Sequence, residues 1–196
     1  RNYASHAQEM GNPVLEEPIF FQKSSTCLSD NSVITLPPER EIHYELEIVA
    51  SICKGGSNIT AEEAWRHVDG LCLGLDLTDR PLQHKFKEEG LPWFLAKSFP
   101  GSAVITQFDL PDLSIWSRDF WLTLNSKEVQ RSNMDQMLFD IPALIAYLSA
   151  RLPLTTGDII YTGTPSGVGL LHQADELVLG LGEEIKGKFR VKSAVS

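Results

Sequence analysis

Three carboxylates carry the strongest chemical signal in this sequence: Glu45 and Glu47, which form a Glu-x-Glu pair, and Asp76. The apolar and β-branched residues around them predict strands over 41–53 and 68–76, and side chains two apart on a strand share a face. Carboxylates in apolar surroundings repel one another, and nothing in these two segments obviously neutralises them. Because hard divalent cations favour oxygen ligands, the set predicts a magnesium, manganese or calcium site.

A plainer interpretation of the Glu-x-Glu pair is an exposed strand face, on which acidic residues are common. Asp76 favours the metal site, because it stands where a mostly apolar run becomes polar abruptly. An acid at the point where a buried strand emerges is well placed for function.

Two further features can act on water or on the charge of a substrate. His6 and Glu9 lie three apart on one face of a helix predicted over 5–10, where the carboxylate orients the imidazole and raises its basicity. A solvated helix face is the plainer interpretation of that pair. Lys97 lies in the apolar run 91–99, where a lysine either extends its ammonium group to solvent or pairs with an anion.

Groups that can hold a substrate follow two of the predicted strands. Arg80 comes soon after Asp76 and brings a guanidinium group near the predicted metal site, with Gln83 nearby. The glycine-rich loop 161–169 follows a buried strand, so its N–H groups and hydroxyls can bind a carboxylate. It lacks the Gly-Lys-Ser/Thr ending of a phosphate loop, and a tight turn that needs glycine is the alternative.

Composition narrows the class of protein. The 196 residues are 42% hydrophobic and 22% charged, as expected for one globular domain spanning 1–196. The net charge of −9 and the scattered Lys and Arg argue against a nucleic-acid partner, and no apolar run is long enough to predict a membrane span. Three cysteines without a Cys-x-x-Cys pair fit a reducing compartment. We therefore expect a cytoplasmic protein, although a targeting signal upstream of residue 1 stays open.

The pattern of elements predicts an α+β domain dominated by a mixed, curled sheet, because helices do not alternate regularly with strands. Thr60 and Glu63 form a capping box that predicts a helix through 68, and apolar residues at helical spacing predict another over 137–152. Further strands are predicted over 18–23, 32–36, 104–108, 119–125, 128–131, 158–162, 176–181 and 184–192.

Five motifs, taken in order, resemble the fumarylacetoacetate hydrolase superfamily, and specifically its acylpyruvase-like branch. They are Arg1-Asn2-Tyr3 with His6 and Glu9-Met10, His43 with Glu45-Leu46-Glu47, Leu75-Asp76-Leu77-Thr78 with Arg80, Gly90-Leu91-Pro92-Trp93 with Ala96-Lys97-Ser98-Phe99, and the loop from Thr162 to Gly169. Each motif is a moderate signal, but their joint order and spacing over nearly the whole chain are specific.

The resemblance implies a β-rich mixed sheet roll with peripheral helices, usually a homodimer. It implies that Glu45, Glu47 and Asp76 bind Mg²⁺ or Mn²⁺, with Ca²⁺ as a substitute. It implies that His6 and Glu9 activate water and that Lys97 acts on the substrate. The substrate contacts that it implies are Gln83 and Thr164, and Arg1, Arg80 and Gly163 are further candidates for substrate binding. Pro81 and Pro100 depart from the family pattern and flank the predicted site, where they bear on loop geometry and substrate preference.

The predicted function is metal-dependent hydrolysis of a C–C bond in small 2,4-dioxo acids such as acylpyruvates or fumarylpyruvate. The metal would chelate the 2-oxo acid portion, His6 would deprotonate water, and Lys97 would stabilise the developing negative charge. Decarboxylation of oxaloacetate or tautomerisation of a 2-oxo acid is the near alternative, because both need only a stabilised enolate. A catalytically silent metal-binding protein with the same fold is the distant alternative.

Overall fold

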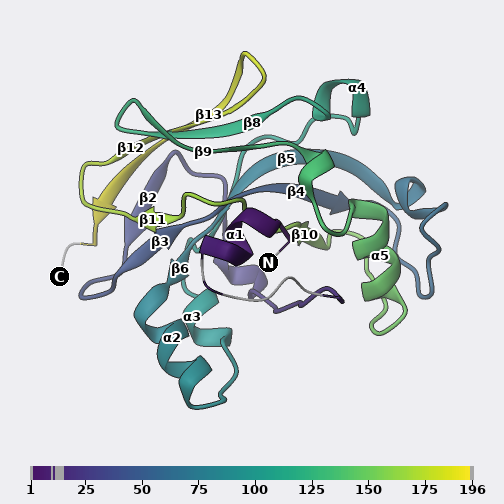
Figure 1. Cartoon of the computed structure of the whole chain (residues 1–196), viewed down its shortest axis with the longest axis horizontal. Coiled ribbons are helices and arrows are strands. Elements are labelled where there is room, and N and C mark those ends of the chain that lie inside the picture. Colours follow the sequence, from purple (N-terminus) through teal and green to yellow (C-terminus); the bar gives the residue numbers. More distant parts are fainter. Residues whose placement is uncertain (1, 10, 12–15, 195–196) are drawn as a thin grey trace.

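A computed structural model of the chain describes residues 2–9, 11 and 16–194. Its strands form two five-stranded sheets and one three-stranded sheet (Figure 1). Buried side chains from both large sheets share one hydrophobic core, which includes Ile48 and Leu73 of one sheet and Leu122 and Leu179 of the other. The sheets contain parallel and antiparallel pairs, so the prediction of a mixed, sheet-rich α+β fold is confirmed.

The first large sheet carries the site. Its order is β1-β7-β5-β4-β10, with bounds Leu28–Ser29, Ala103–Ile105, Val68–Asp76, Leu46–Ile52 and Ile159–Tyr161. The two central strands, β4 and β5, are antiparallel and nearly wholly buried, so they read as continuous apolar runs rather than as an alternation.

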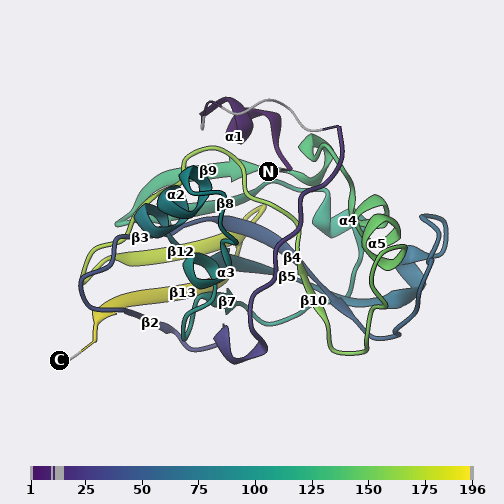
Figure 2. The same cartoon turned by 90° about the horizontal axis from the view of Figure 1, so that it is seen from below.

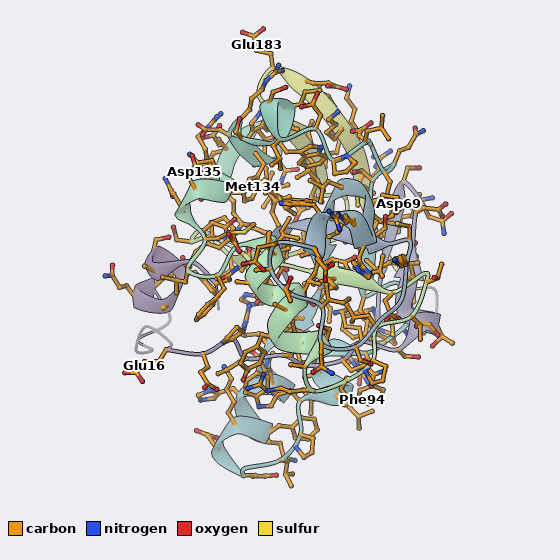
Figure 3. The ribbon with its side chains drawn as sticks, turned by 90° about the vertical axis from the view of Figure 1, so that its right-hand side faces the viewer. Glu16, Asp69, Phe94, Met134, Asp135 and Glu183 are labelled. Carbon is orange, nitrogen blue, oxygen red and sulfur yellow. The ribbon has the colours of Figure 1, made fainter. Side chains whose placement is uncertain are left out.

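The other two sheets complete the framework. The second large sheet has the order β2-β13-β12-β8-β9, with bounds Val33–Leu36, Glu184–Ser193, Glu176–Leu181, Phe120–Leu124 and Lys127–Ser132. The small sheet has the order β11-β3-β6, with bounds Gly169–Leu170, Ile42–Tyr44 and Thr78–Asp79. Figure 3 shows Glu183 at the tip of the β12–β13 hairpin, far from Phe94 in α3, so this hairpin lies away from the helices that line the site.

The helices are short and lie at the periphery. They are α1 (Ala4–Glu9), α2 (Arg80–Glu88), α3 (Phe94–Lys97), α4 (Leu113–Trp116) and α5 (Ile141–Ser149), with 3-10 turns at Ser25–Cys27, Ala64–His67 and Met134–Gln136. Figure 2 shows the chain after residue 16 crossing in front of β4, β5 and β10, with α2 and α3 on one side and α5 on the other. Within the described part of the chain, no helix is long and apolar enough to span a membrane.

Three local predictions are wrong. Residues 18–23 form no strand, because this segment crosses the sheet instead of pairing with it. The helix predicted after Thr60 is only the 3-10 turn Ala64–His67, and Glu63 makes no side-chain cap there. The helix predicted over 137–152 begins at Ile141, because Met137 forms a bridge with Tyr3 and Asp140 accepts the N–H of Ala143 as the cap.

Candidate metal centre and active site

The three predicted metal-binding carboxylates converge. Glu47 lies in β4, Glu45 lies between β3 and β4, and Asp76 ends β5, which is antiparallel to β4 in a register that pairs Leu46 with Leu75. The N–H of Asp76 donates to the carbonyl of Glu45 at 2.8 Å, which fixes the two backbones side by side. One carboxylate oxygen from each side chain lies within 4.8 Å of the other two, and all three residues are buried.

Cationic side chains surround these carboxylates, contrary to the expectation that nothing neutralises them. Lys97 Nζ donates to Glu45 Oε2 at 2.8 Å and to Asp76 Oδ2 at 2.6 Å. Lys23 Nζ donates to Asp76 Oδ1 at 2.5 Å, and Arg80 Nη2 donates to Glu45 Oε1. The sequence predicts Arg80 near the metal site and leaves anion pairing by Lys97 open, but it gives no sign of Lys23, because the crossing segment is not a neighbour of β4 or β5 along the chain.

The neighbouring charges affect the pKa values of Glu45 and Glu47 in opposite directions. Burial alone would raise the pKa of Glu45, but Lys97 and Arg80 outweigh it and hold this pKa well below its usual range. Burial, and then the charges of Asp76 and Glu45, raise the pKa of Glu47 to about 8, against the lowering effect of the Gly163 N–H. Glu47 is therefore the carboxyl group that is mainly protonated near neutral pH when no cation is bound.

Lys97 pairs with anions rather than extending its ammonium group to solvent, which decides between the two interpretations of its apolar surroundings. It is the last residue of α3, its side chain is 2% exposed, and its Nζ also donates to Thr78 Oγ1 at 2.6 Å. Burial opposes its charge, but Asp76 and Glu45 raise its pKa above the ordinary value. The ring of Phe21, in the crossing segment, covers Nζ at 4.7 Å.

His6 and Glu9 form the predicted pair in α1. His6 Nδ1 lies 3.2 Å from Glu9 Oε2, and Glu9 also accepts the N–H of Gly167 at 3.0 Å. Because an Nδ1–H that faces the carboxylate leaves Nε2 with its lone pair, the ring is arranged as a base. Burial, as the largest effect, lowers the pKa of His6, which keeps the imidazole neutral near pH 7.

The glycine-rich loop packs against the metal centre. Gly163 has φ +105°, and a Cβ there would lie 2.6 Å from Cβ of Asn2, so this position needs glycine both for its backbone angle and for space. Its N–H donates to Glu47 Oε2 at 2.6 Å. Thr164 Oγ1 accepts from Gln130 Nε2 at 2.9 Å, and Gln130 Oε1 accepts the N–H of Leu46 at 2.9 Å. The loop is thus both a required turn and part of the site.

Arg80 and Gln83 are held together at the start of α2. Asp79 caps this helix by accepting the N–H of Leu82, and Arg80 Nη1 donates to Gln83 Oε1 at 2.8 Å. Both residues line the cavity that contains the carboxylates. Arg1, the remaining predicted substrate contact, lies outside the described residues.

One cavity of about 770 Å³ joins these groups. Its lining includes the carboxylates, the three cations around them, His6, Gln83, Gly163 and Thr164. It continues past Tyr161 along β10 to the side chains of α5, where the lining becomes largely apolar. The predicted residues within the described part therefore share one site, apart from Glu9, which acts on this cavity only through His6.

Comparison with known proteins decides the family. The family model for the fumarylacetoacetate (FAA) hydrolase C-terminal domain matches residues 1–192. This chain belongs to the fumarylacetoacetate hydrolase family. It is 38% identical to mouse "Oxaloacetate tautomerase FAHD1, mitochondrial" over 98% of the chain and 89% of the relative, and 38% identical to Dictyostelium discoideum "Oxaloacetate decarboxylase, mitochondrial" over 92% and 85%. The structure of Pseudomonas aeruginosa fumarylpyruvate hydrolase in complex with Mn²⁺ and pyruvate matches with TM-score 0.89 and 35% identity, over 99% of this chain and 87% of that one.

The two departures from the fumarylacetoacetate hydrolase pattern leave the metal ligands undisturbed. Pro81 occupies the first turn of α2, where a helix has no partner for an N–H and proline is favourable. Pro100 lies in an exposed turn before Gly101, which has φ +73°. Ser102, just beyond that turn, donates to the carbonyl of Lys97 at 2.9 Å and so ties the turn to α3.

Sequence reasoning missed two residues of the site, Lys23 and Gln130. Lys23 is buried on a segment without regular structure, and burial, the largest effect, lowers its pKa. Gln130 lies in β9 of the other large sheet and reaches the glycine-rich loop from there. Neither Lys23 nor Gln130 belongs to a recognisable local motif. For Gln130, the only signal in the sequence is a polar residue at an inward-facing position of a strand.

Proposed function

We propose that this chain is a divalent-cation-dependent enzyme that interconverts the enol and oxo forms of a small 2-oxo dicarboxylic acid, with oxaloacetate as the first candidate. The observation that carries the proposal is the charge balance around Glu45, Glu47 and Asp76, where three carboxylates face three cationic side chains. A bound divalent cation leaves two positive charges in a buried site, which match a dicarboxylate dianion. The mouse relative, named as an oxaloacetate tautomerase, supports the same choice.

The residues fit a hard divalent cation. Glu45, Glu47 and Asp76 offer three carboxylate oxygens within 4.8 Å of one another, the donor set that magnesium and manganese prefer. A cation held there supplies Lewis-acid stabilisation of the negative charge that develops on an enolate oxygen. The Mn²⁺ in the fumarylpyruvate hydrolase structure supports a divalent ion, and we propose Mg²⁺ or Mn²⁺ for this chain.

The chain's own residues bind the substrate and move its proton. In the proposed reaction, Lys97 faces the oxygen that gains negative charge, and Arg80 and Thr164 hold carboxylate groups. When the enol forms, the neutral His6 ring, held by Glu9, takes a proton from the substrate carbon through Nε2, and the enolate oxygen gains a proton from water. In the reverse direction, the enol oxygen releases its proton to water and the protonated ring returns a proton to the carbon. Phe21 covers Lys97 and keeps water from this ammonium group, which strengthens its effect on the substrate.

Hydrolysis of a 2,4-dioxo acid is the second candidate, and the His6–Glu9 pair favours it. A base that receives the proton of a water molecule is needed for attack on the distal carbonyl, whereas decarboxylation needs no such water. In hydrolysis, His6 would take that proton, the C3–C4 bond would break, and pyruvate and a carboxylic acid would leave. The Dictyostelium relative, named as a decarboxylase, makes release of carbon dioxide a third reaction to measure.

The test is to follow the loss of the enol form of oxaloacetate by ultraviolet absorbance, with Mg²⁺ and then with a chelator. We expect a chelator-sensitive rate above that of buffer with Mg²⁺ alone, and loss of that rate in Asp76→Asn. Pyruvate formation from oxaloacetate and cleavage of acetylpyruvate are measured in parallel. A wild-type rate equal to the buffer rate would refute the tautomerase proposal.

The acetylpyruvate assay with His6→Ala tests the role of His6 as the base in hydrolysis. Cleavage of acetylpyruvate is expected to fall by about a hundredfold or more, the usual contribution of a general base, while Mg²⁺ binding measured by calorimetry stays unchanged. Loss of Mg²⁺ binding in this variant would show that His6 supports the metal centre instead.

The predicted homodimer and cytoplasmic location remain predictions, and the names of the mouse and Dictyostelium relatives place those proteins in mitochondria.

A further inference from the structure

The cavity is longer than a four-carbon acid requires. Its polar end is the metal centre, and its other end lies between β10 and α5. β10 runs antiparallel to β4, with Tyr161 opposite Val49 and Ile159 opposite Ser51. Because Ser51 is four residues beyond Glu47 on β4, the far end lies about 13 Å from Glu47 along the strand.

The far end is lined mainly by aliphatic side chains. They come from Leu144, Leu148, Leu152, Ile159 and Ile160, and Phe20 of the crossing segment, whose ring stacks on Tyr147 of α5, also lines the cavity. Leu152 is 62% exposed although it lines the cavity, so it presents apolar surface that nothing in the described chain covers. Such surface favours an apolar ligand group.

Charges at this end exclude an anionic group. Among the described residues that line the cavity, the Lys and Arg side chains belong to the crossing segment, α2 and α3, and none comes from α5 or β10. The far end instead carries Asp158, whose two carboxylate oxygens accept from the N–H and hydroxyl of Thr155 at 2.7 and 2.9 Å. The Asp158 carboxylate, which is held in place by Thr155, therefore repels a carboxylate at the end of a substrate chain.

We propose that this apolar end binds the uncharged aliphatic acyl chain of a longer 2,4-dioxo acid, so that, among acylpyruvates of equal length, those whose chain ends in a methyl group are preferred over those whose chain ends in a carboxylate. The proposal rests on the proposed function only in that the metal centre holds the 2-oxo acid portion. From that anchor, the chain of the substrate runs along β10 toward Leu148 and Leu152. Cleavage adds water across the C3–C4 bond and gives pyruvate and a fatty acid.

Binding is tested first with 2-oxo acids that have no bond to cleave. Dissociation constants of pyruvate, 2-oxohexanoate, 2-oxooctanoate and 2-oxodecanoate are measured by calorimetry in the presence of Mg²⁺. Burial of one methylene stabilises a complex by about 0.8 kcal/mol, so affinity is expected to increase by roughly fourfold for each methylene that reaches the apolar end, as in the longest acids of the series. Equal affinities along the series would overturn the proposal, including the case in which another part of the protein or a second copy fills the apolar end.

Cleavage then compares two substrates of equal length, hexanoylpyruvate and the acylpyruvate whose chain ends in a carboxylate instead of a methyl group. We expect kcat/KM to be at least tenfold higher for hexanoylpyruvate, because the carboxylated chain would meet Asp158, whereas Arg151, which stacks on the ring of Tyr147 at 3.4 Å, does not line the cavity. A preference for the carboxylated chain would overturn the proposal.

Leu152→Gln and Leu148→Gln place an amide in the apolar end. Leu110→Gln is the matched control, because Leu110 is 79% exposed and does not line the cavity. We expect the first two variants to lose most of the gain in affinity with chain length, and the control to keep the gain of the wild-type protein. If all three variants keep the gain, the assignment of this end is wrong.

The two proposals fail in different ways. A wild-type protein that tautomerises oxaloacetate but ignores chain length retains the proposed function and overturns only the acyl-chain site. A wild-type protein that cleaves hexanoylpyruvate but leaves oxaloacetate at the buffer rate retains the acyl-chain site and overturns only the tautomerase assignment.

Discussion

Replacement of Lys97 by methionine tests whether the ammonium group holds the metal centre together before a cation binds. The side chain keeps its length but loses its charge, which leaves buried Glu45 and Asp76 without a shared partner. Removal of one member of a buried ion pair costs about 3–5 kcal/mol. We expect the lower end, about 3 kcal/mol, because Arg80 and Lys23 still contact the two carboxylates.

The assay is chemical and thermal unfolding without Mg²⁺. For a chain of this size, about 3 kcal/mol lowers Tm by roughly 6–12 °C. Lys186→Met is the matched control, since Lys186 also contacts two carboxylates, those of Asp109 and Glu184, but these acids are exposed. Exposed pairs contribute about 0–1 kcal/mol, so the control is expected to lose at most a third as much stability.

Saturating Mg²⁺ separates the structural role of Lys97 from its proposed role in catalysis. The cation replaces the lost positive charge, so it is expected to restore most of the stability of Lys97→Met and to stabilise this variant more than wild type. Turnover of oxaloacetate is expected to remain a hundred- to thousandfold low, because the group that faces developing charge is absent. Equal destabilisation of Lys97→Met and Lys186→Met, or recovery of turnover with Mg²⁺, would refute this reasoning.

Four further predictions concern the metal centre and the glycine-rich loop beside it. Glu47→Gln is expected to abolish most of the stabilisation by Mg²⁺, about 2.7 kcal/mol at a hundredfold excess over Kd, whereas Asp69→Asn, at an exposed acid, keeps it; equal Mg²⁺-induced shifts in Tm would show that Glu47 is not a ligand. Because the pKa of Glu47 is raised to about 8, cation binding below that pH displaces a proton, so Mg²⁺ affinity is expected to rise roughly tenfold per pH unit from 6 to 8. The same raised pKa makes the cation-free folded chain bind more protons than the unfolded chain between about pH 4.5 and 8. The contribution of Glu47 to the free energy of unfolding therefore falls as pH rises through this range. Calorimetry that gives a pH-independent Mg²⁺ affinity would contradict both statements. Gly163→Ala is expected to lower Tm, since its Cβ would meet Asn2, whereas Gly157→Ala at a similar positive φ has open space and measures the backbone effect alone.

The acidic set was predictable because its geometry follows from short-range rules. Residues 45 and 47 stand two apart, and β4 and β5 are long apolar strands that pair antiparallel, which brings Asp76 to the same end. His6 and Glu9 were likewise predictable from the three-residue spacing on a helix. Each of these contacts follows either from the spacing within one helix or strand or from a single pairing of two strands that the sequence clearly predicts.

The environment of these residues was not predictable in the same way. The surroundings of Lys97 favoured solvent exposure and anion pairing equally, because its neighbours in sequence do not reveal that α3 packs beside β6. Lys23 reaches Asp76 from a segment whose apolar residues imitate a strand but contact the cavity instead. At Thr60, a local capping signal was overridden, as often happens where tertiary packing decides the conformation.

The cations around the carboxylates explain how this site folds before a metal arrives. All four oxygens of Glu45 and Asp76 accept hydrogen bonds from Lys97, Lys23 or Arg80, so both buried carboxyl groups have cationic partners inside the core. An entering cation must share these oxygens, because carboxylate oxygens have further lone pairs, and it must displace the proton of Glu47. The site is then richer in positive charge than the cation-free fold, and a dianionic substrate relieves that excess. The same ammonium and guanidinium groups therefore stabilise the empty site and select an acidic substrate, which is why removal of Lys97 is expected to affect stability and turnover through separable steps.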